Sequence, residues 1–132
     1  MNYLLDSHVF LWALLQPEKL SEKVRLILEN SNNNIFVSAV TFWEISLKFD
    51  LNKLDLNGIS PTDLPALAEQ TGFELLPLMT PEAANYHQLQ ASWHRDPFDR
   101  MLICQAIASH FTLLSKDEHV AKYRSVGLKV TW

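Results

Sequence analysis

Short apolar runs alternate along this chain with segments of helical periodicity. The apolar runs predict five strands, at Asn2 to Leu5, Ile35 to Ser38, Phe73 to Leu76, Thr112 to Ser115 and Leu128 to Thr131. The intervening segments predict helices at Val9 to Leu15, Ser21 to about Asn30, Val40 to Leu51, Ser60 to Gly72, Thr80 to about Ala91, Asp96 to His110 and Glu118 to Tyr123. Strands separated by helices favour βαβ units, which form a parallel sheet covered by helices on both faces. We therefore expect an α/β fold, with any site at the carboxyl ends of the strands.

Length and composition narrow the class of protein. The 132 residues fit a single domain, residues 1–132, with a sizeable buried core. The single cysteine, Cys104, excludes an internal disulfide framework and a cysteine-based zinc cluster. The apolar stretches Val9 to Leu15 and Met101 to Ala108 are shorter than the roughly 20 residues of a membrane span. No secretory signal is recognisable, so we expect a cytoplasmic protein without membrane contact.

The net charge of −4 argues against a protein that binds nucleic acid through bulk charge alone. Most of the 15 acidic residues lie in polar or amphipathic context, where solvated carboxylates are common. A few others lie where a solvated charge is not expected, and these define the candidate site.

Glu44 is the most informative of these acids. On the helix predicted from Val40, its neighbours on the same face are Val40, Leu47 and Leu51, so the carboxylate interrupts an apolar stripe. An isolated buried charge is very unfavourable, so Glu44 must be paired, protonated or bound to a metal. A structural alternative is an ion pair with Arg95 or Arg100.

Asp6 and Asp117 both follow a predicted strand directly. Each has an alternative role as the N-cap of the helix that comes next, although Ser7 could cap the first helix equally well. In a parallel sheet, both residues would lie at the edge formed by the carboxyl ends of the strands.

Two further candidates stand in the segment Asp96-Pro97-Phe98-Asp99. Asp96 precedes a proline at the first helical position, which suits an N-cap. Asp99 falls three residues later, where an acid can complete a capping box. The helix that follows is apolar on nearly all sides, so it is expected to draw Asp99 toward the core.

Together these acids predict a metal site. Carboxylates gathered at one edge of a sheet repel one another unless cations hold them, and hard ions such as Mg²⁺ or Mn²⁺ suit an all-oxygen site. Such ions can activate water and stabilise a phosphoryl group in an in-line displacement. Three cations adjacent to the acids, Arg95, Arg100 and Lys116, are candidates for binding phosphate, with solvated surface charges as the alternative. His8 and His94 also lie near these acids, where a structural or capping role is expected.

Four segments, in this order, resemble those of PIN-domain proteins: YLLDSHVFLWALL, VSAVTFWEISLK, RDPFDRMLICQA and TLLSKDEHV. The resemblance covers essentially the whole chain and is to the VapC-like toxin ribonucleases of type II toxin–antitoxin systems. It implies a three-layer α/β/α sandwich with a central parallel sheet. It also implies a Mg²⁺- or Mn²⁺-dependent endoribonuclease, an RNA substrate, a cognate antitoxin protein and a homodimer.

The resemblance assigns roles to individual residues. Asp6, Glu44, Asp99 and Asp117 match the family's catalytic and metal-binding acids, and Asp96 is an extra acid that could share the metal with Asp99. Hydroxyl groups often accompany these acids in the family, and this chain has serines at the corresponding places: Ser7, Ser38 and Ser115.

Two rival functions remain open. The chain could be a catalytically idle PIN-fold module that acts through a protein partner, with Trp12 and Trp43 as a groove for a partner helix. It could also be a metal-dependent phosphatase acting on small phosphoesters. The acidity does not exclude a nuclease, because without Asp6, Glu44, Asp99 and Asp117 the 15 acids become 11, equal to the 11 Lys and Arg.

Overall fold

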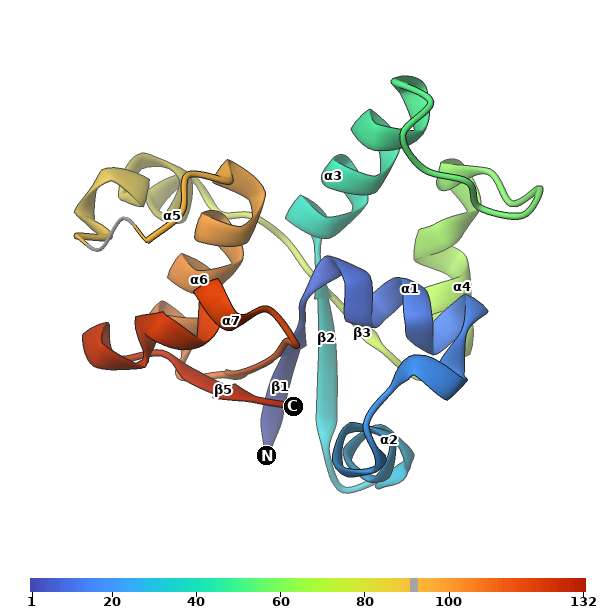
Figure 1. Ribbon diagram of the computed structural model, residues 1–132, viewed down its shortest axis with the longest axis horizontal. Coiled ribbons are helices and arrows are strands. Elements are labelled where there is room, and N and C mark those ends of the chain that lie inside the picture. Colours follow the sequence, from blue (N-terminus) through green and yellow to red (C-terminus); the bar gives the residue numbers. More distant parts are fainter. Residues whose placement is uncertain (91–92) are drawn as a thin grey trace.

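The strands of the computed structural model lie where the apolar runs predict them, within the described residues 1–90 and 93–132 (Figure 1). They are β1 (Asn2–Leu5), β2 (Asn34–Ser38), β3 (Glu74–Leu76), β4 (Thr112–Leu114) and β5 (Lys129–Thr131). The α-helices are α1 (Ser7–Leu15), α2 (Glu22–Glu29), α3 (Ala39–Asp50), α4 (Leu64–Gln70), α5 (Thr80–Ala84), α6 (Pro97–Ser109) and α7 (Glu118–Ala121). Four 3₁₀ turns complete the described elements: η1 (Pro17–Lys19), η2 (Pro61–Asp63), η3 (Tyr86–Gln88) and η4 (Lys122–Val126).

All the strands pair in parallel, in the order β3-β2-β1-β4-β5. The chain builds the sheet outward from β1 to β3 and then returns to the other side of β1 with β4. The strand order therefore reverses between β1 and β4, where Leu5 is in register with Leu114. In open parallel sheets the crevice at such a reversal, at the carboxyl ends of the strands, is the usual ligand site.

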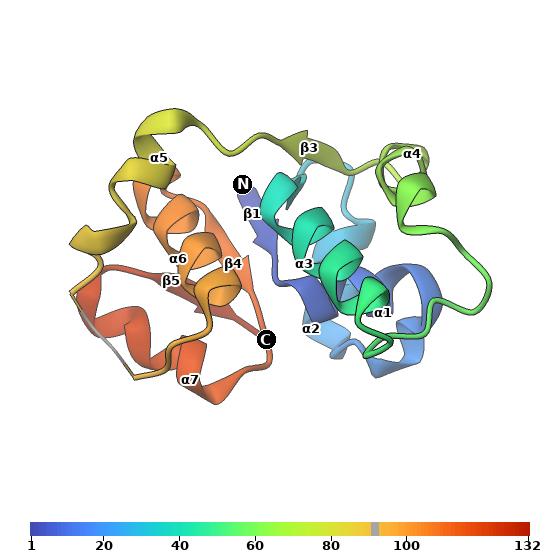
Figure 2. The same ribbon diagram turned by 90° about the horizontal axis from the view of Figure 1, so that it is seen from above.

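Two apolar cores lie on opposite faces of the sheet. Side chains alternate along each strand, so Tyr3 and Leu5 enter one core while Leu4 enters the other. Helices α1, α2 and α4 cover the first face, and α6 and α7 cover the second (Figures 1 and 2). Helix α3 contributes to both cores, through Ile45 and Val40. The expected three-layer α/β/α sandwich is confirmed.

One predicted helix differs clearly from the structure. The segment expected to be helical from Thr80 to about Ala91 forms only α5, which ends at Ala84, and then the 3₁₀ turn η3. The expected end at Ala91 lies outside the described residues. Asn85 and His87 are weak helix formers, and the chain tightens into a 3₁₀ turn after Asn85. The other elements agree with the prediction to within about two residues.

The helices described here include none that is long and apolar enough to cross a membrane.

Candidate active site

Asp6 leaves β1 at the point where the strand order reverses. Its Oδ1 accepts a hydrogen bond from the Ser7 backbone N–H at 2.8 Å, and its Oδ2 accepts one from the Ser115 hydroxyl at 2.6 Å. The residue is only 2% exposed, and burial raises the pKa of its carboxyl group, with a smaller contribution from the charge of Glu44. His8 Nδ1 lies 3.4 Å from Oδ2 and acts in the opposite direction.

Glu44 projects from α3 toward the same edge of the sheet and is 4% exposed. Its Oε1 accepts a hydrogen bond from the Ser7 hydroxyl at 2.6 Å, and its Oε2 forms an ion pair with Lys48, one turn later on α3. The predicted burial is therefore correct, but the ion-pair partner is Lys48 and not Arg95 or Arg100. The proposed apolar stripe was also wrong in part, because Leu47 and Leu51 are 38% and 51% exposed.

Asp96 and Asp99 stand at the N-terminus of α6. Asp96 is the N-cap, since its Oδ1 accepts from the backbone N–H groups of Phe98 (2.9 Å) and Asp99 (3.1 Å). Both of these bonds end on Oδ1, and Oδ2 is left for another ligand. Carboxylate oxygens of Asp96, Asp99 and Glu44 lie within 4.8 Å of one another, which brings α3 and α6 together at one cluster of charge.

The electrostatics of this acid cluster, defined as Asp6, Glu44, Asp96, Asp99 and Asp117, are unfavourable without a cation. Burial, and to a smaller extent the negative charges of the other four acids, together raise the pKa of Asp99 to about 8. Lys48 is the resident counter-charge, and its pKa is raised by Glu44, Asp96 and Asp99 despite its partial burial. A cluster that holds one of its carboxyls protonated near neutral pH is one that a divalent cation would stabilise.

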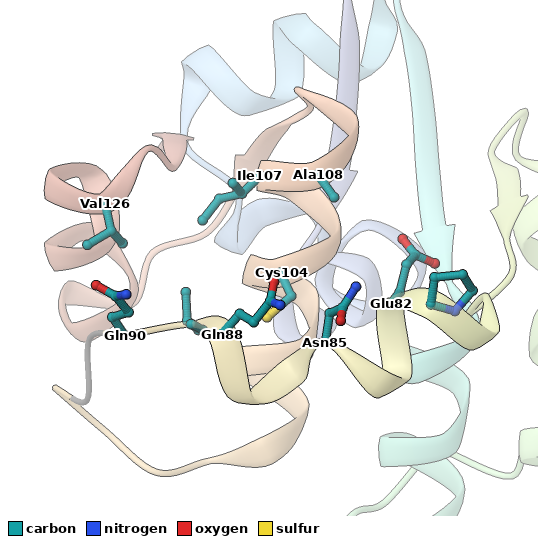
Figure 3. A pocket seen from close by; sticks show the side chains of 10 residues that line it. Glu82, Asn85, Gln88, Gln90, Cys104, Ile107, Ala108 and Val126 are labelled. Carbon is teal, nitrogen blue, oxygen red and sulfur yellow. The ribbon is translucent and has the colours of Figure 1, made fainter.

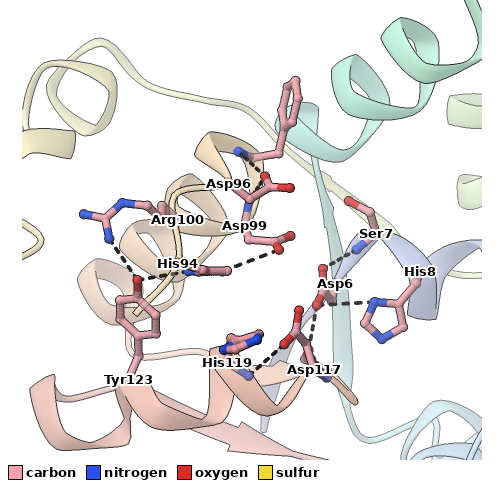
Figure 4. A network of polar contacts seen from close by, with 12 residues as sticks. Asp6, Ser7, His8, His94, Asp96, Asp99, Arg100, Asp117, His119 and Tyr123 are labelled. Atoms are coloured by element: carbon pink, nitrogen blue, oxygen red, sulfur yellow. Dashed lines mark hydrogen bonds and ion pairs between the residues drawn. The ribbon is translucent and has the colours of Figure 1, made fainter. Parts of the chain in front are cut away.

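Asp117 caps α7 by accepting from the backbone N–H of His119 at 2.7 Å, and its own N–H donates to Ser115 Oγ at 3.1 Å (Figure 4). Asp6 and Asp117 are not part of the set of three acids within 4.8 Å. Their charges nevertheless raise the pKa of Asp99, so both face the same site. Ser115 joins the two, because its hydroxyl donates to Asp6 and accepts from Asp117.

The predicted hydroxyl residues separate into two groups. Ser7 and Ser115 donate directly to Glu44 and Asp6, as described above. Ser38 does not lie beside an acid: its hydroxyl caps α3 at the Val40 N–H (3.0 Å) and donates to Gln105 Oε1 (2.5 Å) in the core. Ser38 is the last residue of β2, a strand whose end is covered by the buried Gln105 of α6, and it therefore has a structural role.

The three predicted phosphate-binding cations also differ from one another. Arg95 and Lys116 are exposed next to the acids, and Lys116 Nζ lies 5.9 Å from the centre of the Trp12 ring. Arg100 is 9% exposed and points away from the acid cluster, donating to the hydroxyls of Tyr86 and Tyr123 and to the Leu89 carbonyl (Figure 4). The prediction for Arg100 was wrong, because a buried guanidinium committed to these acceptors is not presented to a phosphate.

Four acids of the cluster, Asp6, Glu44, Asp96 and Asp99, line a cleft of about 340 Å³, and Asp117 is not among its lining residues. Lys48 and Lys53 also line it, and the sequence analysis did not single out either residue. The signal for Lys48 was present, since a lysine four residues after a glutamate on a helix is a favourable pair. The sequence carries no comparable signal for Lys53, which reaches the cleft from the loop after α3.

A larger cavity, of about 480 Å³, lies on another side of α6, between α5, η3 and η4 (Figure 3). Its wall contains one carboxylate, Glu82, whose Oε1 accepts from the Met79 N–H at 2.8 Å. Cys104 also lines it, and burial raises the pKa of this thiol, which keeps it in the unreactive protonated form. The paired acids therefore place the candidate chemistry in the smaller cleft.

Comparisons of the sequence and the fold relate this chain to known proteins. The chain is 26% identical over 129 residues to ribonuclease VapC22 of Mycobacterium tuberculosis, covering 98% of this chain and 97% of that protein. Its fold is similar to those in the FitAcB structure from Neisseria gonorrhoeae (TM-score 0.63, 25% identity, 98% and 96% coverage) and in a DNA-bound VapBC2 structure from Rickettsia felis (TM-score 0.69, 17% identity, 99% and 98% coverage). Residues 3–126 match the PIN domain. The chain therefore belongs to the PIN-domain family.

Proposed function

We propose that this chain is a metal-dependent endoribonuclease that acts as the toxin of a type II toxin–antitoxin pair. The observation that carries the proposal is the meeting of Glu44, Asp96 and Asp99 within 4.8 Å in a cleft of a PIN-domain protein. A relative that matches nearly the full chain is a VapC ribonuclease, which supports RNA as the substrate. The similar structures include a member of the VapBC family of toxin–antitoxin systems, which supports an antitoxin as the partner. We propose that the protein acts in the cytoplasm.

The donor atoms of the site fit Mg²⁺ or Mn²⁺. All are carboxylate oxygens, which hard divalent ions prefer, and the clustered charge that raises the pKa of Asp99 favours a bound cation. Such an ion would supply Lewis acidity and lower the pKa of a water molecule for attack on a phosphodiester.

The side chains of this protein would divide the work. Asp6, Glu44, Asp99 and Asp117 are proposed as the catalytic and metal-binding acids. The position of Asp96, within 4.8 Å of Glu44 and Asp99, supports it as a further ligand as well as a helix cap. Ser7 and Ser115 hold Glu44 and Asp6 in orientation through hydrogen bonds of 2.6 Å each. A ligand whose oxygens are already fixed loses little conformational entropy on binding a metal.

The candidates for phosphate binding are four cations in and beside the cleft. Lys48 and Lys53 line the cleft itself, and Arg95 and Lys116 are exposed beside it. We propose that these four side chains attract the RNA backbone, which the acidic chain as a whole would repel. Arg100 takes no part in this.

The first test is cleavage of a structured RNA by the purified protein in Mn²⁺ or Mg²⁺, repeated after addition of EDTA. We expect cleavage with either ion and none with EDTA, because EDTA removes the ion that activates the water and stabilises the phosphoryl group. RNA that stays intact under both ions while a cognate antitoxin still binds would instead favour the idle binding module. Hydrolysis of a small aryl phosphate without RNA cleavage would favour the phosphatase.

We also propose that the protein is a homodimer. Three large apolar side chains are exposed at four-residue spacing, Trp43 and Leu47 on α3 and Leu51 at its C-cap. The ring centroids of Trp43 and of Phe98 on α6 lie 4.9 Å apart. Exposed apolar side chains aligned in this way are typical of an interface, and this one borders the cleft that Glu44 lines.

For the substitution Leu47→Asp we expect a monomer where the unmodified chain is a dimer, because a carboxylate at the centre of the interface is desolvated without a partner. Sedimentation velocity measures the change, and Leu26→Asp, at an exposed leucine on α2, is the matched control. A Leu47→Asp protein that remains dimeric would show that the two copies meet elsewhere.

A further inference from the structure

A buried chain of polar contacts runs from the core to the acid cluster (Figure 4). Arg100 Nη1 donates to the Tyr123 hydroxyl at 2.8 Å, this hydroxyl lies 3.1 Å from His94 Nδ1, and His94 Nε2 lies 3.5 Å from Asp99 Oδ2. Tyr123 is completely buried, and the His94 side chain is 14% exposed. These contacts end on Asp99, whose pKa is raised to about 8 by burial and by the neighbouring acids.

The direction of these hydrogen bonds follows from the groups themselves. A guanidinium has donors and no acceptor, so the Tyr123 oxygen must accept from Arg100. The phenolic hydrogen of Tyr123 then has one acceptor among its two contacts, His94 Nδ1. An imidazole that accepts at Nδ1 carries its proton on Nε2, which is the nitrogen that faces Asp99.

His94 Nε2 is the buried side-chain atom without a hydrogen-bond partner in the part of the chain described here. Leaving a buried N–H unpaired is unfavourable, and the Oδ2 atom of Asp99 is 3.5 Å away. A movement of a few tenths of an ångström by the carboxylate would complete the bond. The N–H group is therefore aimed at an acceptor that has freedom to approach it.

We propose that His94 is the positioning residue for Asp99. It holds Oδ2 through Nε2–H, and the other carboxylate oxygen, Oδ1, is thereby directed to the acid cluster. The inference rests on the proposed function, because the orientation of Asp99 matters to a cation that the cluster binds. Hydrogen-bond partners of metal-binding carboxylates have this role in general, and their loss weakens metal affinity.

Tyr123 and Arg100, the other members of this series of contacts, hold the imidazole ring of His94 in its orientation. Arg100 is itself fixed by the Tyr86 hydroxyl (3.2 Å) and the Leu89 carbonyl (3.0 Å), and the Tyr123 ring packs edge-on against Trp93 at 4.9 Å. This explains why Arg100 is buried so close to the site without contacting it. Its charge orients the phenol, the phenol orients the imidazole, and the imidazole orients the carboxylate.

Two substitutions of His94 distinguish a role as hydrogen-bond donor to Asp99 from a purely structural role. His94→Gln can place an amide N–H near the position of Nε2, whereas His94→Asn reaches only as far as Nδ1. We expect His94→Asn to weaken Mn²⁺ binding, measured by calorimetry on the full chain, by about 10- to 100-fold. His94→Gln should stay within about threefold of the unmodified chain, and so should the control His87→Gln, at an exposed histidine that contacts the Ala84 carbonyl.

Nitrogen NMR of the metal-free protein, recorded above the pKa of Asp99 (about 8) so that this carboxyl is an acceptor, tests the same inference independently of metal binding. We expect the His94 resonances, identified by their loss in His94→Asn, to show the proton on Nε2. A proton on Nδ1 alone, or equal loss of Mn²⁺ affinity in the Gln and Asn variants, would overturn the positioning role. An unmodified chain that binds no Mn²⁺ would instead count against the proposed function, and the NMR result would still decide the arrangement at His94.

Discussion

Substitution of Asp99 by Asn is expected to reduce metal-dependent RNA cleavage by about 10³-fold or more while it raises the melting temperature of the metal-free protein. Activity falls because a neutral amide is a poor ligand for a hard cation and leaves the cluster one charge short. Stability rises because burial and the neighbouring acids make the ionised form of Asp99 unfavourable in the folded state, where its pKa is about 8, and an amide of the same shape carries no charge to bury. A rise of roughly 5 °C is expected.

Two matched variants make this experiment specific. Asp50→Asn, at an exposed acid of α3, should change neither property. Asp96→Asn keeps the helix cap, since Asn caps as well as Asp, so any loss of cleavage in that variant measures a role in metal binding. An Asp99→Asn protein that still cleaves RNA with Mn²⁺, or that melts at a lower temperature than the unmodified chain, would contradict the assignment of Asp99.

The metal-free protein is expected to lose stability as the pH rises from about 5 to about 8. Between the unfolded pKa of 3.8 and the folded value of about 8, the folded state retains the proton on Asp99 that the unfolded state has released. Stability rises with pH only where the unfolded state binds more protons, so here it falls, and Asp99 alone contributes at most about 1.4 kcal/mol per pH unit. Asp6, whose pKa is also raised by burial, contributes in the same direction.

Thermal melting in EDTA across this pH range measures the effect, to which Asp99 alone should contribute at most roughly 4 °C per pH unit. Addition of Mg²⁺ at pH 8 should recover the lost stability, because the ion binds only the folded cluster. Asp99→Asn should remove most of the slope. A melting temperature in EDTA that is constant or rises between pH 5 and pH 8 would show that Asp99 ionises without penalty.

The sequence allowed the fold to be predicted in detail for a physical reason. Burial on both faces of a parallel sheet makes each strand a short apolar run, and proline and capping residues such as Asp96 mark the helix starts by local hydrogen bonding. The helix predicted from Thr80 failed beyond Ala84, because a helical start signal says nothing about where weak helix formers such as Asn85 end the helix.

The sequence predicted the placement of some residues of the candidate site correctly and that of others incorrectly. Asp6 and Asp117 follow strand ends, so their placement could be inferred from topology alone. The burial of Glu44 was predicted from an apolar stripe, but Leu47 and Leu51 of that stripe are exposed in the structure. The partners of Glu44 are Ser7, which the packing of α1 against α3 brings close, and Lys48, which lies one helical turn later on α3. Arg100 and Ser38 are of the residue types expected beside the acids, but both side chains form hydrogen bonds in the core instead.

By itself, the sequence determined the alternation of strands and helices, the positions of the acids at strand ends and helix starts, and the family. These properties depend on local periodicity and on residue types, which are present in the chain before it folds. Only the tertiary structure decided which acids meet, that Lys48 rather than an arginine balances them, and that Arg100, Tyr123 and His94 form a buried chain of contacts leading to Asp99. Such contacts join residues far apart in sequence, and their geometry is set by how α3 and α6 pack on the sheet, which no local pattern encodes.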